Sequence, residues 1–206
     1  METINPPPHR HKFVFRILRA RIAAMAEEQP EEVKVEARSF MKSLVGSGPP
    51  PSDFTGGDGI DMAAWKATYS SATSKDEALM QQFWSVYDPK STSIWSMVYD
   101  EADSNENLED TIGLVKEFMS KTESIKDHCF GVVHVLGEGL EIEGLWVFNG
   151  EDPEKLFGAN EDTSWYTWSQ LGPEANDLVK EAVAGYLAPT EGKLHGKELR
   201  NTQAFC

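Results

Sequence analysis

Two apolar segments separated by a short loop that contains glycine limit the possible folds of this chain more than any other pattern in its sequence. The segments read CFGVVHVL, at 129–136, and LEIEGLWVFN, at 140–149, and the loop occupies 137–139. Two extended segments joined by so few residues form a β-hairpin, whose strands are antiparallel. The sequence therefore predicts a sheet with antiparallel strands.

The second segment of this hairpin alternates between apolar and polar residues. Such alternation indicates a strand with one buried face and one face that is at least partly solvated. Glu141 and Glu143 begin the solvated face. Leu145 and Val147 follow on the same side, so we expect both faces to be covered near the end of the strand. The opposite, apolar face consists of Leu140, Ile142, Gly144, Trp146 and Phe148.

Residue spacing predicts further elements on either side of the hairpin. Apolar residues at helical intervals and a capping-box pattern indicate helices, whereas period-two alternation indicates strands. The expected elements are a helix from the capping box at 74–77 to Pro89, a strand at 93–99, a helix capped by Asn105 or Asn107, a strand within SWYTWSQL at 164–171, and a helix from Pro173 to Pro189. Together with the hairpin they predict a single compact domain of the α+β class, in which helices pack on an antiparallel β-sheet.

Charge divides the chain into a basic start and an acidic remainder. Residues 1–24 carry arginines and a lysine with Glu2 as their only acidic residue, whereas the whole chain has a formal net charge of −15. Such a segment is typical of a mitochondrial transit peptide, of translated sequence ahead of a start at Met25, or of a helix that binds a partner. Residues 25–59 read as an acidic segment and then a linker rich in glycine and proline, so the folded domain is expected at 60–206.

The acidic composition also restricts what the domain binds. Nucleic-acid surfaces need clustered lysine and arginine, so a net charge of −15 argues against direct contact with nucleic acid and suits protein partners. No apolar run approaches the length that spans a membrane. Cys129 and Cys206 cannot form a disulfide framework, which fits a reducing compartment. We expect a cytoplasmic protein, or a mitochondrial one if residues 1–24 are a transit peptide.

No sequence pattern predicts catalysis, a metal or a cofactor. The chain has neither a Walker-type phosphate loop nor a nucleophile elbow. His128 and His134 would stand roughly 20 Å apart on one face of a strand, with Cys129 on the other face, which is too far to share a zinc ion. We interpret the histidines as core or edge residues. Glu141 and Glu143 could act as paired acid and base groups, but solvated positions on a half-buried strand explain them equally well.

Several segments of the chain resemble a known family. They read AAWKATYS at 63–70, QQFWSVYDPKSTSIW at 81–95, FGVVHVLG at 130–137, GLWVFNG at 144–150, SWYTWSQLGP at 164–173 and HGKELRNTQAF at 195–205. Their order and spacing are similar to the conserved C-terminal domain of elongation factor 1-gamma, a subunit of the eukaryotic translation elongation factor 1 complex. The resemblance implies an α+β domain on an antiparallel sheet, no catalytic chemistry, and scaffolding beside the subunits that exchange nucleotide on elongation factor 1-alpha. The expected partners are then other elongation factor 1 subunits.

The residues ahead of this match depart from the family pattern. Family members usually carry an N-terminal glutathione transferase-like domain and then a lysine-rich linker. The residues before the match contain no thioredoxin-like βαβ pattern. The resemblance is therefore to the C-terminal domain, without the glutathione transferase-like domain.

The aromatic segment near residue 165 supplies candidate partner-binding residues. On a strand, Trp165 and Thr167 would lie on one side and Tyr166 and Trp168 on the other. Both sets cannot face the same core layer, so one set is expected to line a partner-binding groove, where Trp and Tyr are common hot spots. We therefore predict Trp165, Tyr166, Trp168 and Lys197 as candidate partner-binding residues.

Two functions follow from these patterns. The first is a non-catalytic scaffold or interaction domain of the elongation factor 1 complex, which supports translation elongation. The alternative is a stand-alone module that binds a peptide or a small molecule in the aromatic groove, with help from Lys197 or from the pair Glu141 and Glu143.

Overall fold

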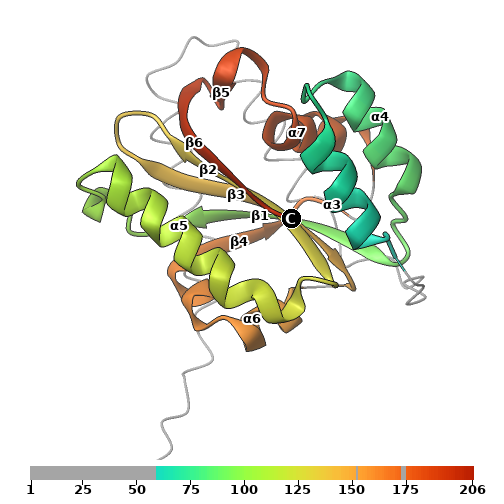
Figure 1. Ribbon diagram of the computed structural model, residues 1–206, viewed down its shortest axis with the longest axis horizontal. Coiled ribbons are helices and arrows are strands. Elements are labelled where there is room, and N and C mark those ends of the chain that lie inside the picture. Colours follow the sequence, from blue (N-terminus) through green and yellow to red (C-terminus); the bar gives the residue numbers. More distant parts are fainter. Residues whose placement is uncertain (1–58, 152, 173–174) are drawn as a thin grey trace, which may run out of the picture. The chain divides into compact units, whose positions relative to one another are not determined.

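An antiparallel sheet with helices on both of its faces makes up the described part of the chain (Figure 1). The computed structural model describes residues 59–151, 153–172 and 175–206. All of them belong to the second of two units into which the chain divides, Met1–Pro49 and Pro50–Cys206. The basic segment at 1–24 and nearly all of the predicted linker lie outside the described residues, and so does Pro173.

The described strands form one six-stranded sheet in the order β4-β1-β3-β2-β6-β5. They are β1 (Thr92–Tyr99), β2 (Cys129–Leu136), β3 (Glu141–Asn149), β4 (Tyr166–Gln170), β5 (Lys193–Leu194) and β6 (Lys197–Phe205). Every neighbouring pair is antiparallel. β2 and β3 form the predicted hairpin, in which Cys129 lies opposite Phe148 and Leu136 lies opposite Glu141. The predicted α+β class with an antiparallel sheet is confirmed.

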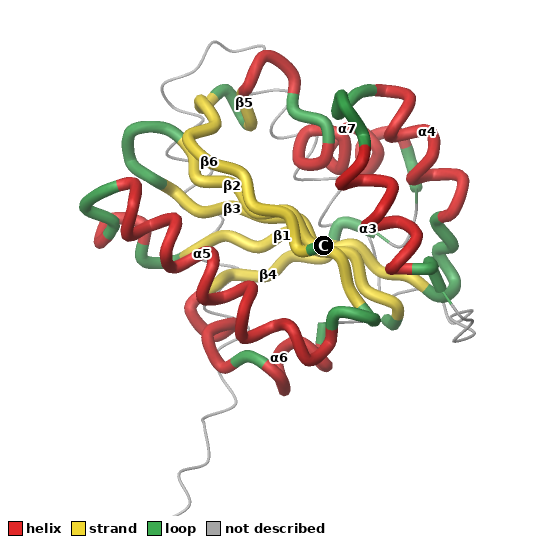
Figure 2. The backbone as a smooth tube through the Cα atoms, viewed as in Figure 1, coloured by secondary structure: helices red, strands yellow, loops and turns green. Residues whose placement is uncertain are grey.

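Helices cover both faces of this sheet (Figure 2). Helices α3, α4 and α7 pack on one face, here termed face A, and α5 and α6 pack on the other, face B. The helices are α3 (Met62–Ser71), α4 (Glu77–Val86), α5 (Leu108–Thr122), α6 (Glu154–Ala159) and α7 (Asp177–Leu187). Short 3-10 helices connect them: η1 (Ala102–Ser104), η2 (Glu123–Ile125), η3 (Glu161–Trp165) and η4 (Thr190–Gly192).

The alternation along β3 distributes its side chains between two hydrophobic cores. Leu145 and Val147 pack with the helices of face A. Ile142, Trp146 and Phe148 pack with the helices of face B. Each of these five side chains is at most 2% exposed, which confirms that both faces of the strand are covered near its end. Burying one Leu or Phe side chain is worth about 1.5 to 3 kcal/mol, so this strand is central to the stability of the domain.

An aspartate, rather than the predicted capping box, begins α4. The side chain of Asp76 accepts the amide hydrogens of Ala78 at 3.0 Å and Leu79 at 3.2 Å. Ser74 instead donates its hydroxyl hydrogen to the Asp76 carboxylate. The carboxylate satisfies two amides that have no partner within the helix, so the helix begins at Glu77.

Asparagines cap the next two long helices. Asn107, one of the two predicted caps, accepts the amide hydrogen of Asp110 at 2.9 Å and begins α5. Asn176 caps α7, which begins at Asp177. The last helix therefore begins later than the predicted start at Pro173, because the side chain that satisfies its free amides belongs to Asn176.

Several elements are not predicted by the sequence patterns. Helices α3 and α6 and strand β6 are absent from the expected elements. β6 reads KELRNTQAF and alternates half-buried with exposed positions, so it lacks a clear apolar period. Trp165 is predicted to lie in a strand but ends η3, and β4 begins at Tyr166.

Candidate functional site

The four predicted partner-binding residues lie in two places. Trp165 ends η3, and Tyr166 and Trp168 follow it in β4, at one edge of the sheet. Lys197 begins β6, which is separated from β4 by β1, β3 and β2. The Lys197 ammonium group forms a 2.9 Å ion pair with Glu141. The structure thus brings the three aromatic residues together and leaves Lys197 apart from them.

Tyr166 and Trp168 face the core of face B. Tyr166 is 8% exposed, and its ring centroid lies 4.9 Å from that of Phe118. Trp168 is half-buried, with its ring centroid 6.5 Å from that of Trp146. Its indole N–H donates to the carbonyl oxygen of Thr163 at 3.2 Å. Tyr166 is therefore a core residue, and Trp168 lies at the margin of the core.

Two large hydrophobic side chains beside β4 are exposed to solvent. Trp165 is 56% exposed, and Phe157 in α6 is 43% exposed. The Phe157 ring contacts the Trp168 ring edge-on, with centroids 5.5 Å apart. Within the described part of the chain, β4 pairs only with β1, so its outer backbone edge has no strand partner there. We term Trp165, Phe157, Trp168 and this outer edge the β4-edge surface.

A buried asparagine fixes the segment that presents Trp165. Asn160 is 1% exposed, and its amide group donates to the Phe118 carbonyl at 2.9 Å and to the Thr122 hydroxyl at 3.1 Å, both in α5. Its side-chain oxygen accepts the amide hydrogen of Asp162 at 3.0 Å, which caps η3. These hydrogen bonds tie the turn to α5. No sequence pattern predicts a role for Asn160, whose only signal is its position before the acidic turn EDTS.

A polar network on face A joins β3, α7 and the turn before β6. The Glu143 side chain is only 13% exposed, and its carboxylate accepts hydrogen bonds from His195 at 3.0 Å and from the Tyr186 hydroxyl at 3.3 Å. The sequence places Glu143 on a solvated face, but α7 covers it. Burial alone would raise the pKa of Glu143, whereas the hydrogen bond and the charge of His195 bring it below its usual range. The carboxylate is therefore ionised and engaged by other parts of the domain.

His134 is fully buried beside this network. Its Nε2 lies 2.9 Å from the carbonyl oxygen of Tyr186, and its Nδ1 lies 2.9 Å from the hydroxyl of Thr202. A carbonyl oxygen only accepts, so the proton of the neutral ring is on Nε2 and the Thr202 hydroxyl donates to Nδ1. Burial lowers the pKa of His134, which keeps the ring neutral at pH 7. The prediction of a core histidine is confirmed for His134.

Lowering the pH below about 6.5 is expected to destabilise the domain through His134. An unfolded histidine binds a proton near pH 6.5, whereas the buried ring resists protonation, so the unfolded state binds more protons as the pH falls. The resulting loss of unfolding free energy approaches about 1.4 kcal/mol per pH unit until the folded ring is also protonated. Urea unfolding between about pH 7.5 and about pH 5.5 measures it.

Two glutamine variants distinguish the contribution of His134 to this pH dependence from the contributions of other titrating groups. His134→Gln should flatten the dependence of stability on pH in this range. His128→Gln is the matched control, because it removes an exposed imidazole and leaves the buried ring of His134 in place. A wild-type slope in His134→Gln would contradict the assignment.

Comparison with known families decides what kind of domain this is. The sequence model described as "Elongation factor 1 gamma, conserved domain" matches residues 50–152, half of the chain. The chain belongs to the elongation factor 1-gamma family. Within the matched residues, this elongation factor 1-gamma domain contains α3, α4, β1, α5 and the hairpin of β2 and β3. The resemblance inferred from the sequence segments is thereby confirmed.

Individual elongation factor 1-gamma proteins are also similar in sequence to this chain. Elongation factor 1-gamma 3 of Oryza sativa subsp. japonica is 28% identical over 145 residues, which is 68% of this chain and 34% of the relative. Elongation factor 1-gamma of Prunus avium is 26% identical over 187 residues, 89% of this chain and 41% of the relative. Elongation factor 1-gamma 1 of Saccharomyces cerevisiae is 27% identical over 135 residues, 65% of this chain and 32% of the relative. The chain thus spans well under half the length of the relatives it matches.

Two further observations concern the described part of this elongation factor 1-gamma domain. It holds no group of three or more His, Cys, Asp or Glu residues that could bind a metal ion. None of its helices has the length and apolar character needed to cross a membrane.

Proposed function

We propose that the chain is a non-catalytic interaction domain that supports translation elongation in the cytoplasm as part of the elongation factor 1 complex. The observation that carries the proposal is membership of the elongation factor 1-gamma family. Its partners are other protein subunits of that complex rather than nucleic acid or membranes. A net charge of −15 favours protein partners with basic surfaces.

The β4-edge surface is the proposed docking site. Trp165 is 56% exposed, and tryptophan is among the residue types that contribute most to protein interfaces. An open strand edge beside it offers backbone hydrogen bonds to an added strand. Asp100, which accepts a hydrogen bond from Thr167 in β4, and Glu161, the first residue of η3, are both exposed, so a basic partner segment fits this surface best.

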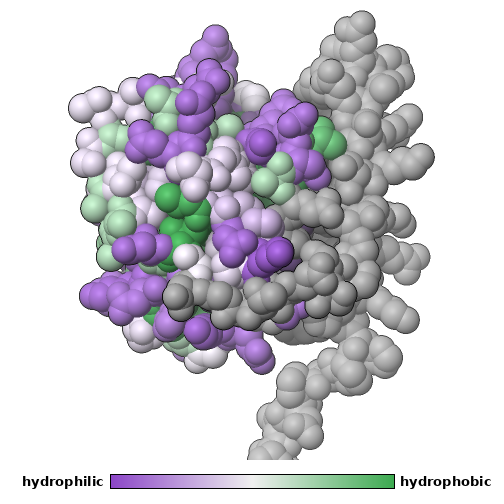
Figure 3. All heavy atoms as spheres, turned by 90° about the vertical axis from the view of Figure 1, so that its right-hand side faces the viewer, coloured by the Kyte–Doolittle hydropathy of each residue, from purple (hydrophilic) through white to green (hydrophobic). Residues whose placement is uncertain are grey.

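Other parts of the domain support docking less well. Figure 3 views the side on which α4 lies, where hydrophilic residues dominate the visible described surface and hydrophobic residues form small separate groups. Lys197, part of the alternative small-molecule function, has its charge compensated by Glu141 at 2.9 Å. Glu143, the other candidate for that function, is already engaged by His195 and Tyr186.

Capture from cell extract tests the proposal. The full chain, used as bait, is expected to recover other elongation factor 1 subunits, identified by mass spectrometry. The double variant Trp165→Ala/Phe157→Ala should weaken this recovery by about tenfold or more, the effect of losing an interface hot spot. It should remain within about 1 kcal/mol of wild-type stability because both side chains are exposed to solvent and lie outside the buried core.

A matched control removes two exposed hydrophobic side chains elsewhere. Leu114 is 41% exposed and Val86 is 48% exposed, and neither belongs to the β4-edge surface. The double variant Leu114→Ala/Val86→Ala should capture the same subunits as the wild type. Undiminished capture by the Trp165 and Phe157 variant would rule out the β4-edge surface, whereas failure of the wild type to recover these subunits would overturn the proposed function itself.

A further inference from the structure

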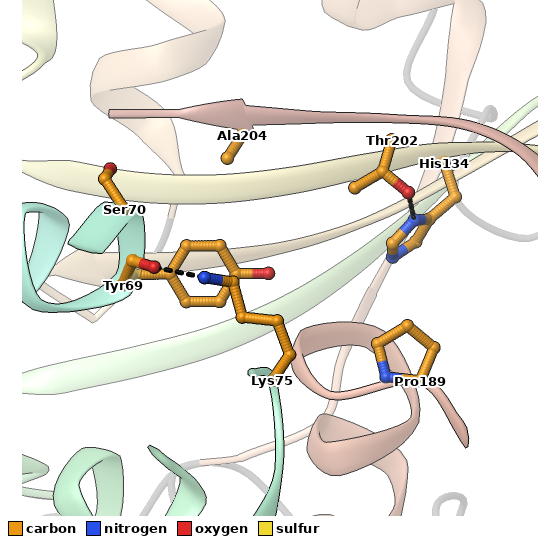
Figure 4. Close-up of a pocket in the computed structure, with 7 residues that line it drawn as sticks. All are labelled: Tyr69, Ser70, Lys75, His134, Pro189, Thr202 and Ala204. Carbon is orange, nitrogen blue, oxygen red and sulfur yellow. Dashed lines mark hydrogen bonds between the residues drawn. The ribbon is translucent and has the colours of Figure 1, made fainter. Parts of the chain in front are cut away.

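A pocket of about 450 Å³ opens on face A, the face of the sheet opposite helices α5 and α6. Its walls come from the end of α3, the loop before α4, strands β2 and β6, and Pro189 after α7 (Figure 4). A volume of this size falls within the range of about 300 to 1,000 Å³ typical of small-ligand sites. No acidic residue of the described part of the chain lines it, although the chain as a whole has a net charge of −15.

Lys75 supplies the positive charge of the pocket. Its ammonium group donates to the carbonyl oxygens of Tyr69 and, at 3.1 Å, of Ala72, and it lies 4.4 Å from the centroid of the Tyr69 ring (Figure 4). An ammonium group has three N–H donors, so one is left for a ligand. The C-terminal end of a helix carries only a partial negative charge, so contact with α3 does not neutralise the lysine.

No carboxylate in the described part of the chain neutralises Lys75. Its sequence neighbour Asp76 directs its carboxylate to the amides of Ala78 and Leu79 at the start of α4. No ion pair joins Lys75 to an acidic residue among the residues that the structure describes. The charge at the pocket is therefore available to an anionic group from outside the domain.

The other polar groups of the pocket define what the ligand must offer. The Ser70 hydroxyl has no hydrogen-bond partner among the described residues and can donate to an anion. The Thr202 hydroxyl donates to Nδ1 of His134, so its oxygen faces a ligand as an acceptor. The Tyr69 ring and Ala204 provide apolar wall area.

We infer that this pocket binds a carboxylate through Lys75, from either a small organic acid or the C-terminus of a peptide. A phosphate group carries more charge and is usually held by several cationic side chains or by the amides at a helix N-terminus, whereas Lys75 is the only lysine or arginine in the described lining of the pocket. The acceptor at Thr202 suits an amide N–H next to the carboxylate, as in an N-acylated amino acid. The apolar walls suit a short aliphatic side chain on the same ligand.

Two probes that differ only in the carboxylate test the inference. Backbone amide NMR of the full chain is recorded with N-acetyl-leucine and with N-acetyl-leucinamide, in which a neutral amide replaces the acid. N-acetyl-leucine should shift the signals of Ser70, Thr202 and Ala204 and bind at least about tenfold more tightly than the amide, as expected when a charge-assisted hydrogen bond is lost. Equal affinity for the two probes, or no shift at these residues with the acid, would overturn the inference.

A third probe separates the two sources of the carboxylate. Acetyl-Ala-Ala-Leu with a free terminal carboxylate should bind more tightly than N-acetyl-leucine if the natural ligand is a peptide terminus. It should bind no more tightly if a small acid is sufficient. Both results support a carboxylate site, and each assigns a different source.

Variants of the chain test whether N-acetyl-leucine binds in this pocket. Lys75→Met should abolish the response to N-acetyl-leucine, whereas Lys75→Arg should retain it. Lys116→Met is the matched control, because it removes the same charge from an exposed position on α5, on face B. Since Lys75 also binds the end of α3, Ala204→Trp offers a second route, filling the pocket from β6 without removing the lysine. Binding that persists in both Lys75→Met and Ala204→Trp would overturn the inference.

Discussion

Trp146→Ala is expected to lower the free energy of unfolding by about 3 to 5 kcal/mol, the range for large aromatic residues removed from cores. Trp146 is fully buried at the centre of face B, with ring centroids 5.6 Å from Phe205 and 5.9 Å from Phe118. Its indole N–H points to the sulfur of Met97 at 3.1 Å. Removal leaves a cavity that two strands and α5 cannot close without losing other contacts. Urea unfolding monitored by circular dichroism measures the loss.

Replacing either of two other tryptophans in the same region should lower the free energy of unfolding by less. Trp168→Ala should destabilise the domain less than Trp146→Ala, because Trp168 lies at the margin of the same core. Trp165→Ala should change stability by about 0.5 kcal/mol or less, as surface substitutions usually do, since that ring is 56% exposed. A loss below about 1 kcal/mol for Trp146→Ala, or an equal loss for Trp165→Ala, would contradict the arrangement of the face B core.

The elements that the sequence predicts best are those whose patterns depend on local geometry alone. The hairpin of β2 and β3 is visible because its strands are apolar and its loop is short, and both constraints act within twenty or so residues of chain. The cap of α5 is predicted as Asn105 or Asn107, because both precede a helical apolar stripe, and the structure shows that it is Asn107. In each case the residues that specify the element are also the residues that it contains.

The elements that the sequence misses depend on distant partners. β6 pairs with β2 and has half-buried and exposed residues in turn, so its strand conformation comes from pairing rather than from its own apolar pattern. The alternation in SWYTWSQL correctly separates Tyr166 from its neighbours, but it does not say which side of β4 meets the core. That choice is made by Phe118 and Trp146, which lie far away in the sequence.

The candidate sites also depend on residues that lie far apart in the sequence. Trp165 is identified by its residue type, but its exposure depends on Asn160 and its hydrogen bonds to α5. The pocket at Lys75 has no sequence signature, because its walls join the loop before α4 to β2 and β6. A lysine next to an aspartate reads as a solvated pair until the structure shows that Asp76 caps α4 and Lys75 binds the end of α3.

Gly131→Ala is expected to destabilise the domain by about 2 to 3 kcal/mol, at the upper end of the range for overpacked cores. Gly131 lies in β2 directly opposite Trp146 in β3. A Cβ atom at Gly131 would lie 2.6 Å from Cδ2 and Cε3 of the Trp146 ring, well inside van der Waals contact. The ring has no free space to move into, because it is fully buried between Phe118 and Phe205.

The expected destabilisation is opposite in sign to the usual effect of replacing glycine by alanine, because alanine is normally the better residue within a helix or a strand by about 0.5 to 1 kcal/mol. Gly113→Ala supplies the control: Gly113 lies inside α5, nothing lies within 4 Å of an added Cβ, and the substitution should stabilise the domain by about 0.5 to 1 kcal/mol. Making the Gly131 change in a Trp146→Leu background should reduce its effect, since the two sites are in contact and their energies couple. Stabilisation by Gly131→Ala, or an undiminished loss in the Trp146→Leu background, would show that the close approach of β2 to the Trp146 ring does not determine the packing of face B.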